Sequence, residues 1–196
     1  MILTHTTHLG VFDLKTVRNI VIIVIVVALL IFSVLTPYNL VKTKQSNISD
    51  SLKLLNAQIE QRAELLDGLS AYLDPQLEIE QEIKGIISDI NNQTRSASTI
   101  SEKADANKEV SSVVNGIINY SNSNTDKRRK DFVDELVKLR DMQVRVNTAK
   151  NDYNTLIDSY ISETQRFPLN VVVKFVKTDD FEYFMTAEEL QEHNKR

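Results

Sequence analysis

The chain has 196 residues, of which 42% are hydrophobic and 26% charged, with a formal net charge of -4. This mild acidity argues against a nucleic-acid-binding protein, which usually carries a large basic surplus. The complete absence of cysteine excludes disulfides, thiolate metal sites and a cysteine nucleophile.

The first predicted element is a membrane anchor at residues 19–38, after a short N-terminal tail at residues 1–18. Every residue from 20 to 35 except Ser33 is apolar, and none is charged. Such a run makes roughly 24 Å of helix, and a bilayer core requires roughly 20 residues. Polar and aromatic neighbours such as Asn19 and Tyr38 can supply the missing length at the interfaces. We therefore expect a single-pass protein of the cell membrane.

A cleavable signal peptide is the alternative to an anchor. Lys15 and Arg18 precede the apolar run, as the positive residues of a signal peptide do. However, residues 33–37 lack the two small residues of a cleavage site. The pattern therefore favours an anchor that is retained.

The segment at residues 39–168 has the apolar spacing of long helices. Apolar residues step by three and four through residues 38–73, and Asp74-Pro75 ends this helix. A second helix follows, with a stretch at residues 91–101 that is rich in poor helix formers. A polar turn at residues 121–126 leads into the last helix, which Pro168 stops.

Narrow apolar stripes on these helices must bury one another, which predicts an all-α, antiparallel up-down bundle. The bundle has three long helices, or four if the middle one breaks near residues 91–101. The C-terminal tail at residues 169–196 is expected to pack on the bundle as a short helix or an irregular segment. Its expected anchors are Phe175, Phe181 and Phe184.

Three polar residues, Arg62, Gln143 and Lys150, occupy positions of the apolar seams. A few polar groups in a seam select one helix alignment at some cost in stability. A buried polar site that binds or senses something is the alternative. We favour alignment control, with the stems of Arg62 and Lys150 along the seam and their charged heads in water at its edge.

A basic cluster opens the last helix: Lys127, Arg128, Arg129 and Lys130. A solvated helix start is the ordinary explanation. If the second helix returns to the membrane, the cluster could instead contact anionic lipid headgroups. Near-equal numbers of Lys and Arg flank the anchor on its two sides, so orientation in the membrane stays open.

Candidate catalytic and metal-binding residues are few. Glu78 and Glu82 share a helix face but fit a solvated face better than a carboxylate pair. His5 and His8 precede the anchor, whereas His193 lies near the other end of the chain. No nucleophile and base pair is evident, so we expect no enzyme, no catalytic or metal site and no cofactor.

Three segments are similar in sequence to one known family. Residues 38–41 read Tyr-Asn-Leu-Val directly after the anchor, and residues 62–66 read Arg-Ala-Glu-Leu-Leu. The third segment has Tyr-Asn at 153–154, Phe-Pro-Leu-Asn at 167–170 and aromatic residues at 181–184. Together they resemble the LemA family of bacterial membrane-anchored helical proteins. The resemblance implies an N-terminal membrane helix and an all-α domain, and it brings no established activity, cofactor or substrate.

The chain departs from the family pattern at Asp67, where the family usually has Pro, and at Gln143 and Lys150, where it usually has Glu and Arg. We expect a non-enzymatic, membrane-anchored scaffold or adaptor whose partners are the lipid bilayer and either another protein or a second copy. The alternative is a regulator or sensor of a membrane enzyme such as an envelope protease, because family genes often lie beside a membrane metalloprotease. Nucleic acid and a small-molecule substrate are not expected.

Overall fold

The computed structural model of the protein describes residues 14–74, 76–123 and 130–195, without the side chains of residues 30, 33 and 34. The described residues form helices joined by turns and contain no strand, so the protein is all-α as predicted. None of the described helices combines the length and the apolarity needed to cross a membrane.

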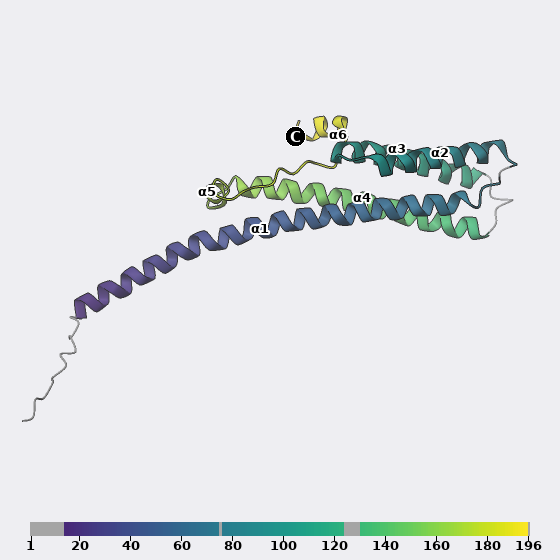
Figure 1. Cartoon of the computed structure of the whole chain (residues 1–196). Helices are drawn as coiled ribbons and strands as arrows, with labels where there is room; N and C mark the ends of the chain where they lie inside the picture. Colours follow the sequence, from purple (N-terminus) through teal and green to yellow (C-terminus); the bar gives the residue numbers. More distant parts are fainter. Residues whose placement is uncertain (1–13, 75, 124–129, 196) are drawn as a thin grey trace, which may run out of the picture.

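The first helix, α1 (Leu14–Ser70), is one unbroken element that carries both the apolar run and the first stripe of the bundle. Figure 1 shows it extending far beyond the other helices and curving gently along its length. Pro37 lies inside α1, although a proline removes one backbone donor and crowds the preceding turn. Turn hydrogen bonds at Ala71 to Leu73 then close the segment before Asp74.

Three further helices complete the bundle: α2 (Glu78–Ser96), α3 (Ile100–Ser123) and α4 (Lys130–Thr164). The predicted break is confirmed at residues 97–99, where Thr99 and Glu102 form reciprocal capping hydrogen bonds at the start of α3. The middle part of the bundle is therefore two short helices rather than one long helix. The four helices alternate in direction, and α4 runs back along α1 over most of its length (Figure 1).

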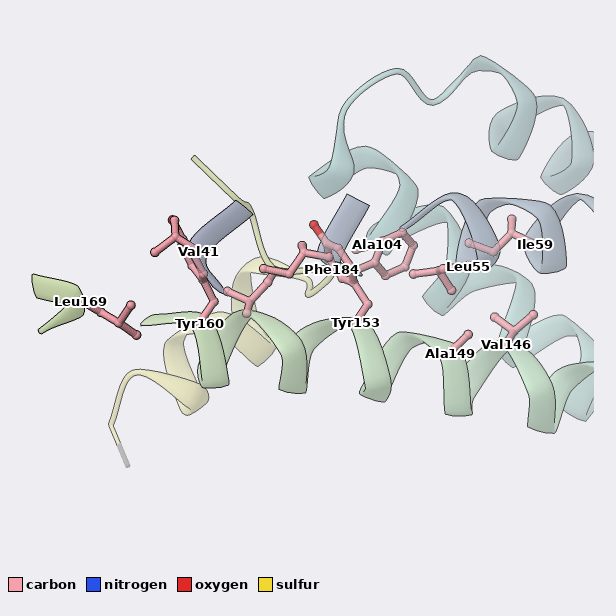
Figure 2. Packing of buried hydrophobic residues seen from close by; sticks show 12 residues of the cluster. Val41, Leu55, Ile59, Ala104, Val146, Ala149, Tyr153, Tyr160, Leu169 and Phe184 are labelled. Carbon is pink, nitrogen blue, oxygen red and sulfur yellow. The ribbon is translucent and has the colours of Figure 1, made fainter. Parts of the chain in front are cut away.

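The hydrophobic core consists of two clusters. The proximal cluster is nearer the Leu14 end of α1 and also takes residues from the tail (Figure 2). Its buried members are Val41, Ile48, Leu55, Ile59, Ala104, Val146, Ala149, Tyr153, Ile157, Tyr160, Leu169 and Phe184. The distal cluster lies toward the far end of the bundle. Its buried members are Leu66, Leu69, Leu73, Ile87, Ile90, Val110, Val114, Ile117, Phe132, Leu136 and Leu139.

The tail packs on the bundle with two short helices, α5 (Leu169–Val172) and α6 (Ala187–His193). Two of the three predicted anchors are confirmed, because Phe184 is fully buried and Phe181 packs edge-on against Tyr160. The third is wrong, since Phe175 is 86% exposed. The helical turns that follow α5 place Phe175 on the side of the segment that faces away from the core.

Candidate functional site

A layer of polar residues separates the two hydrophobic clusters. Three helices each place one buried polar side chain in it: Arg62 on α1, Asn107 on α3 and Gln143 on α4. Apolar core residues flank the layer on each helix: Ile59 and Leu66 on α1, Ala104 and Val110 on α3, and Leu139 and Val146 on α4. The layer is therefore the boundary at which one cluster ends and the other begins on all three helices.

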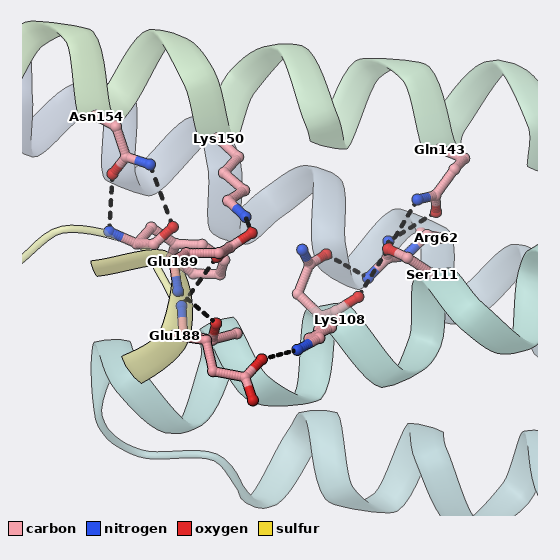
Figure 3. A network of polar contacts seen from close by, with 11 residues as sticks. Arg62, Lys108, Ser111, Gln143, Lys150, Asn154, Glu188 and Glu189 are labelled. Carbon is pink, nitrogen blue, oxygen red and sulfur yellow. Dashed lines mark hydrogen bonds and ion pairs between the residues drawn. The ribbon is translucent and has the colours of Figure 1, made fainter. Parts of the chain in front are cut away.

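The side chains of the polar layer are connected to one another by hydrogen bonds (Figure 3). Arg62 donates from Nη1 to Gln143 Oε1 at 2.8 Å and from Nη2 to Asn107 Oδ1 at 2.8 Å. Ser111, one turn after Asn107, accepts from Gln143 Nε2 at 2.8 Å and from Arg62 Nη1 at 3.4 Å. The Ser111 hydroxyl in turn donates to the Asn107 carbonyl at 2.7 Å.

Arg62 is a fully buried cation whose hydrogen-bond acceptors are all neutral. Burial lowers the pKa of its guanidinium to about 10, because desolvation disfavours the charged form. The group still carries a proton at neutral pH, since 10 lies well above 7. Its Nε is buried without a hydrogen-bond partner. A shift of this size corresponds to a destabilisation of about 3 kcal/mol relative to an exposed arginine.

The predicted polar seam is only partly one site. The structure brings Arg62 and Gln143 together, but Lys150 turns outward and pairs with Glu189 of α6 at 2.6 Å. The expectation that the Arg62 head reaches water is wrong, because neighbouring helices enclose the side chain completely. The apolar spacing alone does not single out Asn107, although Asn107 precedes the apolar residue Val110 by one helical turn.

A second polar contact involves Asp67, the residue at the family's usual proline position. Asp67 Oδ1 accepts a hydrogen bond from Asn91 Nδ2 at 2.6 Å, and Oδ2 pairs with Arg95 at 2.9 Å. Asn91 also donates to the carbonyl of Ala63 at 3.1 Å. The Asp67 carboxylate therefore links α1 to α2. A proline at this position has no side-chain oxygen and does not make these contacts.

The tail is held to α4 by the Tyr153-Asn154 pair. The Asn154 amide makes two hydrogen bonds with the backbone of Phe184, accepting from its N–H at 2.8 Å and donating to its carbonyl at 3.2 Å. Tyr153 donates its hydroxyl to the carbonyl of Glu182 at 2.8 Å. Burial raises the pKa of the Tyr153 phenol to about 12, so it stays a neutral donor. These contacts fix Phe184 in the proximal cluster.

The last helix, α6, is joined to the bundle by two ion pairs (Figure 3). Glu188 pairs with Lys108 of α3 at 2.8 Å, and Glu189 pairs with Lys150 of α4. Glu189 also closes a capping box with Thr186 at the start of α6. Burial raises the pKa of the Glu189 carboxyl, but hydrogen bonds from Lys150 and Thr186 hold it below its ordinary value overall. The Lys108 pair is exposed and contributes little to stability.

Of the predicted basic cluster, the structure describes only Lys130. Lys127, Arg128 and Arg129 lie outside the described residues, and Lys130 begins α4. Phe132, two residues on, packs in the distal cluster with Leu73 near the end of α1. The start of α4 is therefore at the bundle end far from the apolar run, because the middle segment folds back on itself as α2 and α3. The contact of these four residues with lipid stays a prediction.

The remaining candidates for chemistry are separated. Among the described residues, no three His, Asp or Glu side chains lie close enough together to hold a metal ion. Glu78 and Glu82 are both exposed on α2. His193 lies 3.1 Å from Asp158 and against the ring of Tyr183, whereas His5 and His8 lie outside the described residues.

These features define an all-α bundle protein with one overlong N-terminal helix, a core divided by a polar layer and a tail tied back onto its last long helix. The model of the LemA family matches residues 51–195, which is most of the chain. The chain therefore belongs to the LemA family. A search of curated proteins found no match.

Proposed function

We propose that the protein is a membrane-tethered, non-enzymatic scaffold or adaptor that holds a helical rod at the membrane surface. One observation carries the proposal. Every described large apolar side chain between residues 20 and 35 is 47–72% exposed, all around a single helix. A continuous apolar surface of this kind requires an apolar environment in the functioning protein. A single-pass anchor provides this environment, and membership of the LemA family fits a membrane-associated protein.

The length of the apolar run is consistent with an anchor when its neighbours are included. The strict run is shorter than the roughly 20 residues of a typical span. Asn19 precedes it, and Tyr38 and Leu40 follow it on the same helix. The helix continues without interruption into the bundle. Anchor and rod would therefore be mechanically one element, because a helix transmits orientation better than a flexible linker does.

The scaffold role is supported by what the bundle core contains. Its most elaborate buried constellation is the polar layer around Arg62, which has neutral partners and is closed to solvent. Such a layer suits the alignment of helices better than turnover of a substrate. A fixed helix alignment also determines which side chains face outward. A partner-binding surface requires such a fixed set of outward-facing side chains.

Co-purification of the full-length protein in mild detergent, with chemical cross-linking beforehand, tests the scaffold role. We expect either a stoichiometric membrane-protein partner or self-association of the chain. A variant lacking residues 1–35 serves as the control for contacts that need the membrane. Recovery of an intact, monomeric protein without a partner from cross-linked membranes would contradict the scaffold role. A stoichiometric protease partner whose activity changes with the protein would instead indicate a regulator.

A further inference from the structure

The corner between α4 and α5 exposes large apolar side chains at the proximal end of the bundle. Phe167 is 83% exposed, Phe175 86% and Val171 47%. Large exposed aromatic residues are unusual on a protein surface unless they meet a partner or a membrane. The three residues follow one another at intervals of four.

This interval places Val171 and Phe175 on one face of the helical turns at residues 168–176, and Phe167 immediately precedes these turns. Residues 168–176 form consecutive helical turns, with hydrogen bonds such as Val173 N–H to the Leu169 carbonyl and Val176 N–H to the Val172 carbonyl. Side chains four positions apart lie on the same side of such turns. The opposite side packs on the core through Leu169 and Val172, which are buried. The segment is therefore apolar on two faces, and only one of them is covered by the described residues.

The uncovered face lies at the level where the apolar run of α1 ends. A groove of about 330 Å³ is lined by Thr36, Pro37 and Leu40 of α1 and, on its other side, by five residues at the end of α4 and in the corner. These are Glu163, Arg166, Phe167, Pro168 and Leu169. Figure 1 shows α5 at the end of the bundle from which the free part of α1 emerges. If residues 20–35 span a bilayer, the corner lies at its surface.

The charges around the corner differ from those of the whole chain. Residues 36–49 and 165–177 include five basic residues and no acidic one, in a chain with a net charge of -4. The basic residues are Lys42, Lys44, Arg166, Lys174 and Lys177. The nearest acidic residue on α4, Glu163, is already paired with Lys44 at 2.8 Å. Aromatic residues with basic neighbours are typical of segments that lie in the headgroup region of an anionic membrane.

We propose that Phe167, Val171 and Phe175 form an interfacial foot, which inserts into the same membrane leaflet surface from which α1 emerges, with Arg166 and Lys174 contacting anionic lipid headgroups. This inference rests on the proposed anchor. The foot would give the rod a second attachment point beside α1. Two attachment points limit the tilt and rotation of the bundle relative to the bilayer. A single membrane helix leaves both motions free.

Site-specific fluorescence in nanodiscs tests the foot on the full chain. The chain has no cysteine, so single substitutions accept an environment-sensitive fluorophore without a background label. Phe175→Cys reports on the foot and Ile25→Cys on the anchor. Val144→Cys is the matched control, because Val144 is an apolar residue of α4 that is 61% exposed and distant from the corner. Bromine-labelled lipids quench only labels that touch acyl chains, whereas iodide quenches labels in water.

We expect the lipid quencher to act at positions 25 and 175 and iodide to act at position 144. Quenching by lipid at position 25 with an aqueous label at position 175 would overturn the foot and leave the anchor intact. Quenching at 175 without quenching at 25 would support the foot and contradict the anchor. A label at 175 that neither quencher reaches would show that a protein surface, such as a second copy, covers the face, which also overturns the foot.

The basic residues are tested by changing the lipid. Quenching at position 175 should be stronger in phosphatidylglycerol mixed with phosphatidylcholine than in phosphatidylcholine alone. Arg166→Gln and Lys174→Gln should each weaken docking about fivefold in the anionic lipid, as expected for one surface charge. Lys138→Gln, at an exposed position on α4 in the distal half, is the control. Equal quenching in both lipids, unchanged by the Gln variants, would overturn the role of the two cations.

Discussion

Arg62 on α1 and Gln143 on α4 are joined by a 2.8 Å hydrogen bond between residues 81 positions apart in the chain, and neither side chain contacts a carboxylate there. The pair lies at the boundary between the proximal and distal clusters. A shift of α4 along α1 by one turn would leave a buried cation facing apolar residues. The hydrogen bond therefore selects one alignment of two apolar stripes that could otherwise slide past each other.

The first prediction concerns the energetics of this layer. Gln143→Leu alone should destabilise the bundle by about 3 kcal/mol, because it removes an acceptor and leaves the buried cation less satisfied. Replacing the three buried polar side chains of the layer together, with Arg62→Met, Asn107→Leu and Gln143→Leu, should be neutral or stabilising by about 1–4 kcal/mol. Urea unfolding in detergent micelles measures the free energy of unfolding of the single and the triple variant. Arg140→Met, an exposed arginine of α4, is the control and should change stability by less than about 0.5 kcal/mol.

The same triple variant should fold with a less definite helix alignment. Spin labels on Leu54→Cys and Val144→Cys, both exposed apolar positions, measure the distance between α1 and α4. We expect a single narrow distance distribution in the otherwise unchanged protein and a broader or split distribution, or a changed oligomeric state, in the triple variant. A narrow distribution with an unchanged oligomeric state would show that the apolar core alone determines alignment.

The second prediction concerns the apolar stripe of α1. Leu55 is fully buried in the proximal cluster, whereas its neighbour Leu54 is 55% exposed. Leu55→Asp should destabilise the bundle by several kcal/mol, because it buries an unpaired charge. Leu54→Asp changes the same residue type at the next position and should be tolerated. The thermal midpoints of the two variants are compared by the loss of helical circular dichroism on heating. Equal midpoints would refute the assignment of Leu55 to the buried face of α1 and of Leu54 to the exposed face.

The third prediction concerns the attachment of the tail. Asn154→Leu keeps the volume of the side chain but leaves the N–H and carbonyl of Phe184 without partners. A cost of about 2 kcal/mol corresponds to roughly thirtyfold more frequent opening of the tail. Hydrogen exchange should therefore accelerate at residues 181–190 and stay unchanged at residues 48–66. Asn151→Leu, at an exposed position on the same helix, should leave both segments unchanged.

The fourth prediction concerns acid stability. Backbone hydrogen bonds from Thr99 and then Ser98 lower the pKa of Glu102 to about 2. A carboxyl group with a lowered pKa in the folded state stabilises the fold above its ordinary pKa of 4.5, and this stabilisation is lost as pH falls toward 2. Glu102→Gln should therefore lower the thermal midpoint at pH 7 and reduce its dependence on pH between 4.5 and 2. An unchanged pH profile would show that the capping contact contributes nothing, and Glu109→Gln is the exposed control on the same helix.

The sequence predicts the helices well because their apolar spacing is a local property. The long stripes of α1 and α4, a break somewhere in residues 91–101 and the resemblance to the family follow from spacing, composition and motif alone. The direction of the middle segment does not follow in the same way. Whether residues 97–99 form a bend or a reversal depends on the packing of α2 and α3 on each other, which is a contact between separate elements.

The polar layer was predicted only in part for a similar reason. The stripe positions identify Arg62 and Gln143 as polar residues in the apolar seams. They do not show which residue of one helix lies opposite which residue of another. Asn107 and Ser111 complete the layer from α3, and their role depends on the alignment of that helix. Lys150 occupies an equivalent seam position, but it forms an ion pair with Glu189 of the tail. Helical spacing does not predict this contact. Phe175 was assigned inward because it is aromatic, although the turns after α5 place it outward.

Extraction of the full-length protein, followed by measurement of its intact mass, tests whether residues 20–35 attach the protein to the membrane. We predict that the protein stays with the membrane pellet after alkaline carbonate treatment and that its mass includes the apolar run. The exposed side chains of this run, from Val27 at 47% to Phe32 at 72%, are the reason for this expectation. A carbonate-soluble product that begins near Thr36 would contradict the account, because the run would then be a cleaved signal.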